Sequence, residues 1–269
     1  VPMASITKIM TLLLTLEAVE AGKISMTDIV PISEHAFNMG GSQIWLKEGE
    51  QMRVEDLIKA VCVVSGNDAA VALGEHLAGS EEAFVARMNE RAKELGMNDT
   101  HFVNCTGLPA DGHVTSAYDI ALMSRELIWR HPDIRRFTTI WMDSLRGGAS
   151  MLVNTNKLVR FYPGATGLKT GSTDSAKYCI SATAEKDGME LIAVILGGST
   201  SDKRFSDAKA LLNYGFAAYS LVTVTPESPL PAVPVTLGTQ KTVQSVLTSE
   251  NALLLEKSRA NGLTQAISL

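Results

Sequence analysis

The stretch Pro2-Met3-Ala4-Ser5-Ile6-Thr7-Lys8 leads into the apolar run Ile9-Met10-Thr11-Leu12-Leu13-Leu14, and together they predict a helix from Ser5 to Ala21. Residues three apart lie on one face of a helix, so Lys8 should stand directly above Ser5. The partial positive charge of a helix N-terminus would favour a developing serine oxyanion. A neutral lysine one turn away could accept the hydroxyl proton. A serine and a lysine at this spacing often occur together by chance, so the significance of this motif depends on the rest of the chain.

The composition is that of an ordinary globular protein. Of the 269 residues, 45% are hydrophobic and 20% are charged, and the net charge is −5. The mild acidity and the absence of a Lys/Arg block argue against a nucleic-acid-binding surface. No run of about 18 apolar residues predicts a membrane-spanning helix, and no stretch resembles a signal peptide. The length suffices for one large domain, or for a domain with a small appendage.

The spacing of the cysteines and histidines predicts no metal site. The cysteines show no C-x-x-C spacing and no histidine partners at metal spacing, so we expect small buried side chains. The histidines are expected to be structural or to lie at the surface. These residues are Cys62, Cys105 and Cys179, and His35, His76, His101, His113 and His131.

Two helices are expected around a polar turn within apolar sequence. They run from Val54 to Val61 and from Ala69 to Leu77, and the turn includes Ser65-Gly66-Asn67-Asp68. The glycine allows a sharp change of direction, which would point the serine and the asparagine into one cavity. An ordinary helix connection with Ser or Asn as N-cap is the alternative interpretation.

Three further helices are expected, from Glu81 to Leu95, from Ala117 to Trp129, and from Ser206 to Tyr219. The Gly-rich loop Asn38-Met39-Gly40-Gly41-Ser42 is either the rim of a site or an ordinary connection. The segment from Asp143 to Tyr162 is mixed and predicts no single element.

The clearest sheet signal follows Gly167-Leu168-Lys169-Thr170-Gly171-Ser172-Thr173. Strands are predicted over Tyr178–Ala184 and Leu191–Leu196, joined by the turn Glu185-Lys186-Asp187-Gly188 as a β-hairpin. After Ser220, several prolines and short alternating runs predict a linker and a small β-rich unit.

Three motifs now stand in one order: Ser5-Ile6-Thr7-Lys8, Ser65-Gly66-Asn67 and Lys169-Thr170-Gly171. The set S-x-x-K, S-D-N and K-T-G is the signature of class A β-lactamases and penicillin-binding proteins. Each motif also has the expected context, because the first opens a helix, the second is a turn between helices, and the third enters a strand. Their combination favours a serine enzyme that forms an acyl-enzyme.

The chain resembles the low-molecular-mass penicillin-binding proteins that are D-alanyl-D-alanine carboxypeptidases. The resemblance extends from Val1 to about Tyr219, and Ser-Gly-Asn at residues 65–67 favours this branch over class A β-lactamases. It implies an α/β (α+β) fold with an antiparallel sheet flanked by helices. It also implies two regions: 1–220, a transpeptidase-like catalytic domain, and 221–269, a linker with a partial β-rich domain. We expect the family's N-terminal strands, and the rest of its C-terminal domain, to lie outside this chain.

The resemblance also implies a role for the first two motifs. Ser5 would attack the carbonyl of the penultimate D-alanine, form an ester and expel the last D-alanine. Lys8 would be its base, kept neutral by burial and by Lys169. Ser65 would relay the proton to the leaving amine.

The remaining residues would bind the substrate. Asn67 would hydrogen-bond its backbone amide, and Lys169 with Thr170 would hold its terminal carboxylate. Gly171 leaves room for the peptide to pair as an added β-strand. The backbone N–H groups of Ser5 and Ser172 would form the oxyanion hole.

Two nearby residues are left open by the sequence. Thr173 is as readily structural as functional, and Arg204 is either a support on the carboxylate side or a solvated charge. No metal or organic cofactor is expected. The implied partners are peptidoglycan pentapeptides and β-lactam antibiotics, with no nucleic acid.

The substrate implies an exported, extracytoplasmic protein, because peptidoglycan peptides lie outside the cytoplasmic membrane. Its signal peptide is not in this chain. We expect membrane attachment only through residues outside this chain, since Ala260–Leu269 lacks the pattern of an amphipathic helix.

Two alternatives belong to other classes. A class A β-lactamase needs a deacylating glutamate between Ser65 and Lys169, and the sequence after Glu126 does not match that pattern. We therefore expect β-lactams to acylate Ser5 and to leave slowly. The other alternative is a non-hydrolytic sensor of β-lactams or peptides, which would release no D-alanine.

Overall fold

In the computed structural model, a helix that is buried over most of its surface lies within the larger of two units. Helix α1 (Lys8–Glu20) follows a short 3-10 helix, η1 (Ala4–Thr7), and its residues Ile9, Met10 and Leu12 are fully buried. Such a helix requires neighbours on all sides, and α4 and α6 pack against it. The prediction of one helix from Ser5 to Ala21 is corrected at its start, because the first turn is the tighter 3-10 type.

The structure describes residues 1–224, 229–246, 251–260 and 262. Backbone contacts divide the chain into a unit of Val1–Glu185 with Glu190–Leu212, and a unit of Lys186–Met189 with Asn213–Leu269. The division into domains 1–220 and 221–269 stays a prediction. The segment Ala260–Leu269 lies mostly outside the described residues.

The larger unit contains most of the helices. Its other helices are α2 (Glu34–Phe37), α3 (Val54–Val64), α4 (Asn67–Ala78), α5 (Glu81–Glu94), α6 (Ala117–Arg130), α7 (Arg135–Thr138) and α8 (Leu158–Phe161), with 3-10 turns at Pro132–Ile134 and Arg146–Gly148. The predicted helices therefore exist, with ends shifted by a few residues. Ser116 caps α6, since its Oγ accepts the N–H of Asp119 at 3.2 Å.

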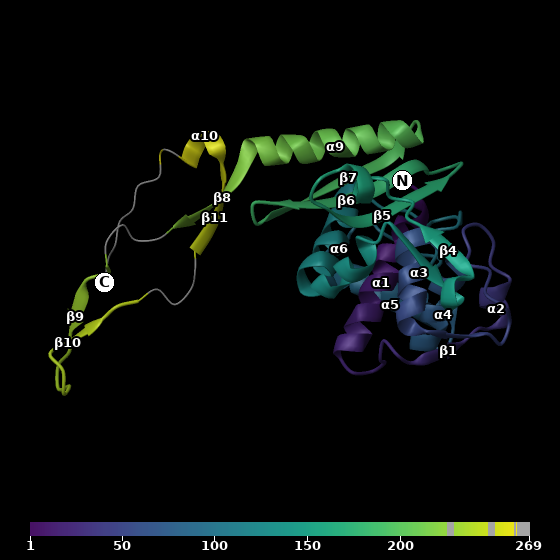
Figure 1. The fold of residues 1–269 in the computed structure, drawn as a ribbon, viewed down its shortest axis with the longest axis horizontal. Coiled ribbons are helices and arrows are strands. Elements are labelled where there is room, and N and C mark those ends of the chain that lie inside the picture. The colour runs from purple at the N-terminus through teal and green to yellow at the C-terminus, as the bar shows by residue number, and fades with distance from the viewer. Residues whose placement is uncertain (225–228, 247–250, 261, 263–269) are drawn as a thin grey trace. The chain divides into compact units, whose positions relative to one another are not determined.

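Three strands form the main sheet, in the order β5 (Ala165–Thr173), β6 (Lys177–Lys186) and β7 (Met189–Gly198). Strands β5 and β6 are antiparallel, with Lys169 opposite Ser181 and Gly171 opposite Cys179. The two-residue turn after β6 can join β7 only in the antiparallel sense. Helix α9 (Ser201–Ala218) lies on one side of this sheet and α1 and α6 on the other (Figure 1). The predicted antiparallel sheet between helices is confirmed.

Two short antiparallel strand pairs complete this unit, and the second of them is a hairpin. Strand β1 (Ile29–Pro31) pairs with β2 (Gln51–Arg53), and β3 (Met142–Leu145) pairs with β4 (Ser150–Val153). This hairpin and α8 occupy the segment that the sequence left unassigned. Its strands alternate between a buried face and an exposed face that carries methionines, which hides the usual polar alternation.

The smaller unit is rich in β-structure. Strand β8 (Tyr219–Val224) pairs with β11 (Asn251–Glu256), and β9 (Ala232–Pro234) pairs with β10 (Thr242–Gln244). A short helix, α10 (Lys257–Ala260), follows β11. The predicted β-rich C-terminal segment is therefore confirmed for the described residues.

Helices α4 and α5 pack tightly against each other at Gly74 and Phe84. Phe84 is fully buried against Gly74, where an added Cβ would lie 2.9 Å from the Phe84 ring. We expect Phe84→Ala to lower the free energy of unfolding by about 3–5 kcal/mol, measured by denaturant titration, because it opens a cavity. Phe161→Ala is the control: this ring is 63% exposed and has an edge contact with Trp141, so its loss should cost about 1 kcal/mol. Equal losses would contradict this account.

Candidate active site

Ser5 and Lys8 contact each other as the sequence predicts. The distance from Lys8 Nζ to Ser5 Oγ is 2.9 Å. Ser5 lies in η1, where Ile6 N–H donates to the Met3 carbonyl and the Thr7 hydroxyl donates to the Ala4 carbonyl. Ala4 adopts a left-handed conformation with φ +49°. These local bonds tighten the first turn and bring the serine next to the lysine.

Lys8 is buried completely and reaches two carbonyl oxygens besides the serine. Its Nζ donates to Asn67 Oδ1 at 2.6 Å and to the Thr106 carbonyl at 2.7 Å. None of the ion pairs formed by the described residues involves Lys8. Burial, aided by the nearby Lys169, holds the pKa of Lys8 well below its ordinary value.

The Ser65-Gly66-Asn67 turn brings its asparagine to this lysine. Ser65 ends α3 in a left-handed conformation, φ +63°, which is strained for a residue other than glycine. Its buried Oγ has no hydrogen-bond partner among the described residues. Such an unpartnered buried hydroxyl commonly marks a functional position. Asn67 begins α4, and its Nδ2 donates to the Gly40 carbonyl at 2.6 Å.

The Gly-rich loop is the rim of this site, which the sequence had left open. The backbone N–H of Asn67 donates to the Ser42 carbonyl at 2.7 Å. A Cβ at Gly41 would lie 2.7 Å from Asn67 Nδ2, so this approach requires glycine. Buried Asp68 accepts the N–H groups of Ile44 and Leu46, which fixes the end of the loop. The sequence signal for this was the acidic residue directly after Ser-Gly-Asn.

Strand β5 brings the third motif to the same place. Lys169 is 1% exposed, and its Nζ donates to the Thr170 carbonyl at 2.9 Å. Burial, with a smaller effect of Arg204, lowers the pKa of Lys169 to about 7. The Thr170 hydroxyl lies 2.7 Å from that of Thr155, a contact that the sequence did not predict. A Cβ at Gly171 would lie 2.8 Å from Ser5 N, so only glycine permits this approach.

The structure decides between the readings of Arg204 and Thr173. Arg204 is 7% exposed, and its Nη1 donates to the carbonyls of Gly171 and Cys179. Through these hydrogen bonds Arg204 stabilises β5 and its neighbour β6, and it is not a solvated charge. Thr173 Oγ1 accepts the N–H of Ala176 at 3.0 Å, which is a structural role in the turn after β5. Ser172 is exposed on the same strand.

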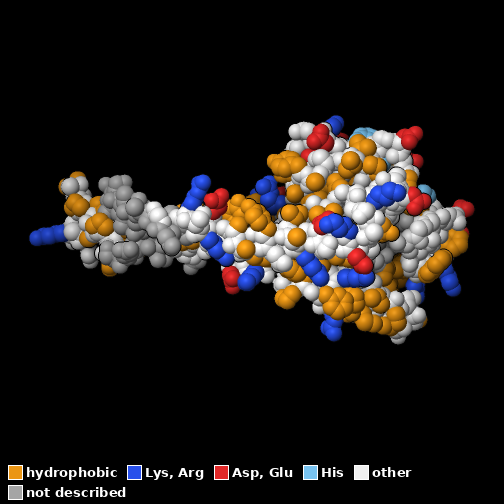
Figure 2. Space-filling view, turned by 90° about the horizontal axis from the view of Figure 1, so that it is seen from above, with side chains coloured by type: hydrophobic (Ala, Val, Ile, Leu, Met, Phe, Trp, Pro, Cys, Tyr) orange, Lys and Arg blue, Asp and Glu red, His pale blue; other side chains and the backbone are white. Residues whose placement is uncertain are grey.

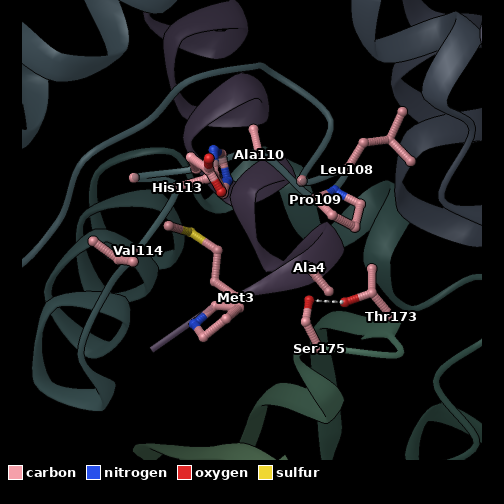
Figure 3. A pocket seen from close by; sticks show the side chains of 13 residues that line it. Met3, Ala4, Leu108, Pro109, Ala110, His113, Val114, Thr173 and Ser175 are labelled. Carbon is pink, nitrogen blue, oxygen red and sulfur yellow. Dashed lines mark hydrogen bonds between the residues drawn. The ribbon is translucent and has the colours of Figure 1, made fainter.

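A pocket of about 410 Å³ borders the backbone beside Ser5. Figure 3 shows its walls: Met3 and Ala4, the segment that carries Leu108 to Val114, and Thr173 with Ser175. Ser5 itself does not line it. The pocket therefore lies beside the end of β5 at Thr173 and is not the space above Ser5 and Lys8.

The cysteines have the buried environment of structural residues. Cys62, Cys105 and Cys179 are free and buried, as predicted. Within the part of the chain that the structure describes, no group of three or more His, Cys, Asp or Glu residues could hold a metal ion. No helix there has the length and apolar character of a membrane-spanning segment.

Comparison with known proteins places these motifs in one family. The model of the D-alanyl-D-alanine carboxypeptidase family, peptidase S11, matches residues 1–200. The chain belongs to this family. The resemblance read from the three motifs is thereby confirmed.

Two curated relatives in this family are D-alanyl-D-alanine carboxypeptidases. DacF of Bacillus subtilis (strain 168) is 46% identical over 258 residues, which cover 94% of this chain and 66% of the relative. DacC of Escherichia coli (strain K12) is 38% identical over 236 residues, which cover 84% and 57%. The chain thus spans somewhat less than two thirds of the length of these relatives.

Solved structures of penicillin-binding proteins share the fold. PBP3 from Streptococcus pneumoniae, described as a peptidoglycan synthesis regulatory factor, matches with a TM-score of 0.83 at 30% identity, over 96% of this chain and 79% of that chain. Penicillin-binding protein D2 from Listeria monocytogenes, in an ampicillin-bound form, matches with a TM-score of 0.73 at 36% identity, over 80% and 87%.

Gly107 gives a direct test of how closely the carboxypeptidase-family site is packed. It has φ +86°, and an added Cβ would lie 1.9 Å from the Ala4 carbonyl oxygen. We expect Gly107→Ala to lower the melting temperature clearly more than Gly112→Ala. Gly112 lies in the same segment with φ +80°, but an added Cβ there meets only His101 Nδ1, at 3.9 Å. Equal shifts would show that backbone conformation, and not this contact, sets the cost.

Proposed function

We propose that this chain carries the active site of a serine-type D-alanyl-D-alanine carboxypeptidase, with Ser5 as nucleophile and Lys8 as its base. The observation that carries this proposal is the 2.9 Å contact between Ser5 Oγ and a fully buried Lys8 amine. The substrate is a peptidoglycan stem peptide that ends in D-Ala-D-Ala. Family membership supports the assignment, since the curated relatives bear this activity in their names.

The surroundings of Lys8 suit a neutral amine. A neutral amine has two N–H donors and one lone pair. The carbonyl oxygens of Asn67 and Thr106 take the two donors. The lone pair then faces Ser5, so the hydroxyl proton moves to Lys8 as Oγ attacks the substrate carbonyl.

Proton delivery to the leaving group falls to Ser65. The collapse of the tetrahedral intermediate breaks the peptide C–N bond, and the departing D-alanine amine needs a proton. The unpartnered, buried Ser65 hydroxyl would pass the proton on from Lys8. Water then attacks the Ser5 ester while Lys8 accepts its proton. The bond between the acyl carbon and Ser5 Oγ breaks, Lys8 returns the proton to Oγ, and the shortened peptide is released.

Strand β5 and the Gly-rich loop would hold the substrate. Strand β5 is an edge strand, so an extended peptide can pair with it beside Gly171. The Lys169 amine and the Thr170 hydroxyl would bind the terminal carboxylate. The backbone N–H groups of Ser5 and Ser172 would bind the oxyanion. One N–H of the Asn67 amide bonds Gly40, and the other would meet the substrate backbone.

Slow deacylation of β-lactams is expected from the same site. Glu126, the residue considered as a deacylating glutamate, forms an ion pair with Arg91 at 2.7 Å. It is therefore engaged in a surface network and does not activate a water. The ampicillin-bound relative supports β-lactams as ligands. We propose an extracytoplasmic location, where peptidoglycan is found.

Replacement of the nucleophile tests the assignment. We expect Ser5→Ala to abolish the release of D-alanine from a peptide ending in Lys-D-Ala-D-Ala, and to remove the penicillin adduct seen by mass spectrometry. Ser25→Ala is the control, since Ser25 lies in an exposed turn. Wild-type protein that binds penicillin covalently but releases no D-alanine would favour the sensor. Rapid turnover of a chromogenic β-lactam would favour the β-lactamase.

The pH dependence of acylation tests the role of Lys169. Because Lys8 is a base only when neutral, the acylation rate at saturating β-lactam should rise with pH through the lowered pKa of Lys8. The pKa of Lys169 is about 7, so its charge acts on Lys8 below that pH. Lys169→Met removes this charge, and the acid limb should move to higher pH.

Lys203→Met is the control for this titration, because Lys203 is exposed and paired with Asp207. Its acid limb should stay where the wild type has it. A limb in Lys169→Met that is unmoved, or that moves to lower pH, would contradict the proposed coupling of the two lysines.

A further inference from the structure

A buried histidine connects the segment at residues 103–113 with the turn that carries Ser5. His113 is 4% exposed, and its Nδ1 accepts the backbone N–H of Val103 at 3.0 Å. A neutral imidazole that accepts at Nδ1 carries its proton on Nε2. His113 Nε2 lies 2.7 Å from Thr7 Oγ1, so the ring donates to the threonine hydroxyl. Burial lowers the pKa of His113 to about 4, so the ring stays neutral and these directions hold at neutral pH.

Thr7 passes this constraint to the backbone of the nucleophile. Its hydroxyl, oriented by His113, donates to the Ala4 carbonyl at 2.9 Å. That oxygen and the Ser5 N–H belong to one planar peptide group, so fixing the direction of one fixes the other. Ala4 also has φ +49°, a conformation that an alanine does not favour by itself.

Two glycines leave this peptide little room. A Cβ at Gly107 would lie 1.9 Å from the Ala4 oxygen, and a Cβ at Gly171 would lie 2.8 Å from Ser5 N. The peptide group is therefore enclosed by the 107–114 segment on one side and by β5 on the other. Figure 3 shows His113 and Ala4 on the walls of the same pocket.

We propose that His113 and Thr7 are positioning residues for the oxyanion hole: they hold the Ala4–Ser5 peptide so that the Ser5 N–H points at the developing oxyanion. The inference rests on the proposed function, in which this N–H is one of the two donors. Oxyanion stabilisation depends on donors that are oriented before the reaction begins. Neither side chain needs to touch the substrate, and His113 needs no change of protonation.

Thr7→Val and Thr7→Ser separate the hydroxyl from the shape of the side chain. Removal of an oxyanion donor costs about 10²–10³ in kcat, so misdirecting one should cost about 10- to 100-fold. We expect this loss in Thr7→Val, both in kcat for D-alanine release and in β-lactam acylation at saturation. KM should stay within about threefold of the wild-type value, because the substrate contacts remain. Thr7→Ser keeps the hydroxyl and should stay within about threefold of the wild type.

A peptide boronic acid supplies a readout that a merely structural role would not move. Its adduct with Ser5 is tetrahedral and places an oxygen in the oxyanion hole. The loss of its affinity in Thr7→Val should match the loss in kcat/KM. Circular dichroism melting of each variant establishes that the assays use folded protein.

The combination with His113→Leu tests whether the two residues act as one unit. If His113 acts only through the Thr7 hydroxyl, the double variant should be as slow as Thr7→Val alone. Multiplying effects would overturn the proposed connection. Wild-type rates in Thr7→Val, or unchanged boronic acid affinity, would overturn the positioning role while the wild type remains active. An inactive wild type would overturn the proposed function itself.

Discussion

The site depends on the burial of the Lys8 amine, which has no carboxylate partner among the described residues. A lysine in an apolar interior loses its hydration, and this favours the neutral form unless an acid lies beside it. Asp68, whose charge acts on Lys8, accepts the backbone N–H groups of Ile44, Leu46 and Ala69. It therefore stabilises the rim loop and leaves the lysine to two carbonyls and the serine. Its charge raises the pKa of Lys8, but burial has the larger effect and holds that pKa well below its ordinary value.

The carbonyl at Thr106 depends in turn on a well-held segment. Asn104 Oδ1 accepts the N–H groups of Thr106 and Gly107, at 3.2 and 2.7 Å, which shapes the turn. Glu81 at the start of α5 accepts the N–H of Cys105 at 3.0 Å. The packing of α5 on α4 thus helps to hold the backbone beside Thr106, whose carbonyl accepts a hydrogen bond from Lys8. Core packing therefore affects the geometry of the site. If the Thr106 carbonyl moved, it would no longer orient the Lys8 amine.

Much of the site could be predicted from sequence, because three short motifs carry its proposed nucleophile and base and its strand. The 3-10 form of the first turn could not, since it depends on the Thr7 hydroxyl and on Gly107, about 100 residues away in the sequence. The contact of Thr155 with Thr170 was also out of reach, because the hairpin before it shows no clear alternation. Arg204 looked like a surface charge in sequence, and only the fold shows it behind β5. Local sequence patterns do not show which segments, far apart in the sequence, approach each other closely in the fold.

The protonation state of Lys8 is the central claim, and it can be measured directly. In protein labelled with ¹³C at lysine Cε, an NMR titration would follow each lysine, with Lys8 assigned by the signal lost in Lys8→Arg. The account predicts that Lys8 titrates well below the ordinary lysine range of about 10.4. A Lys8 signal that titrates with the exposed lysines, near that ordinary value, would contradict it.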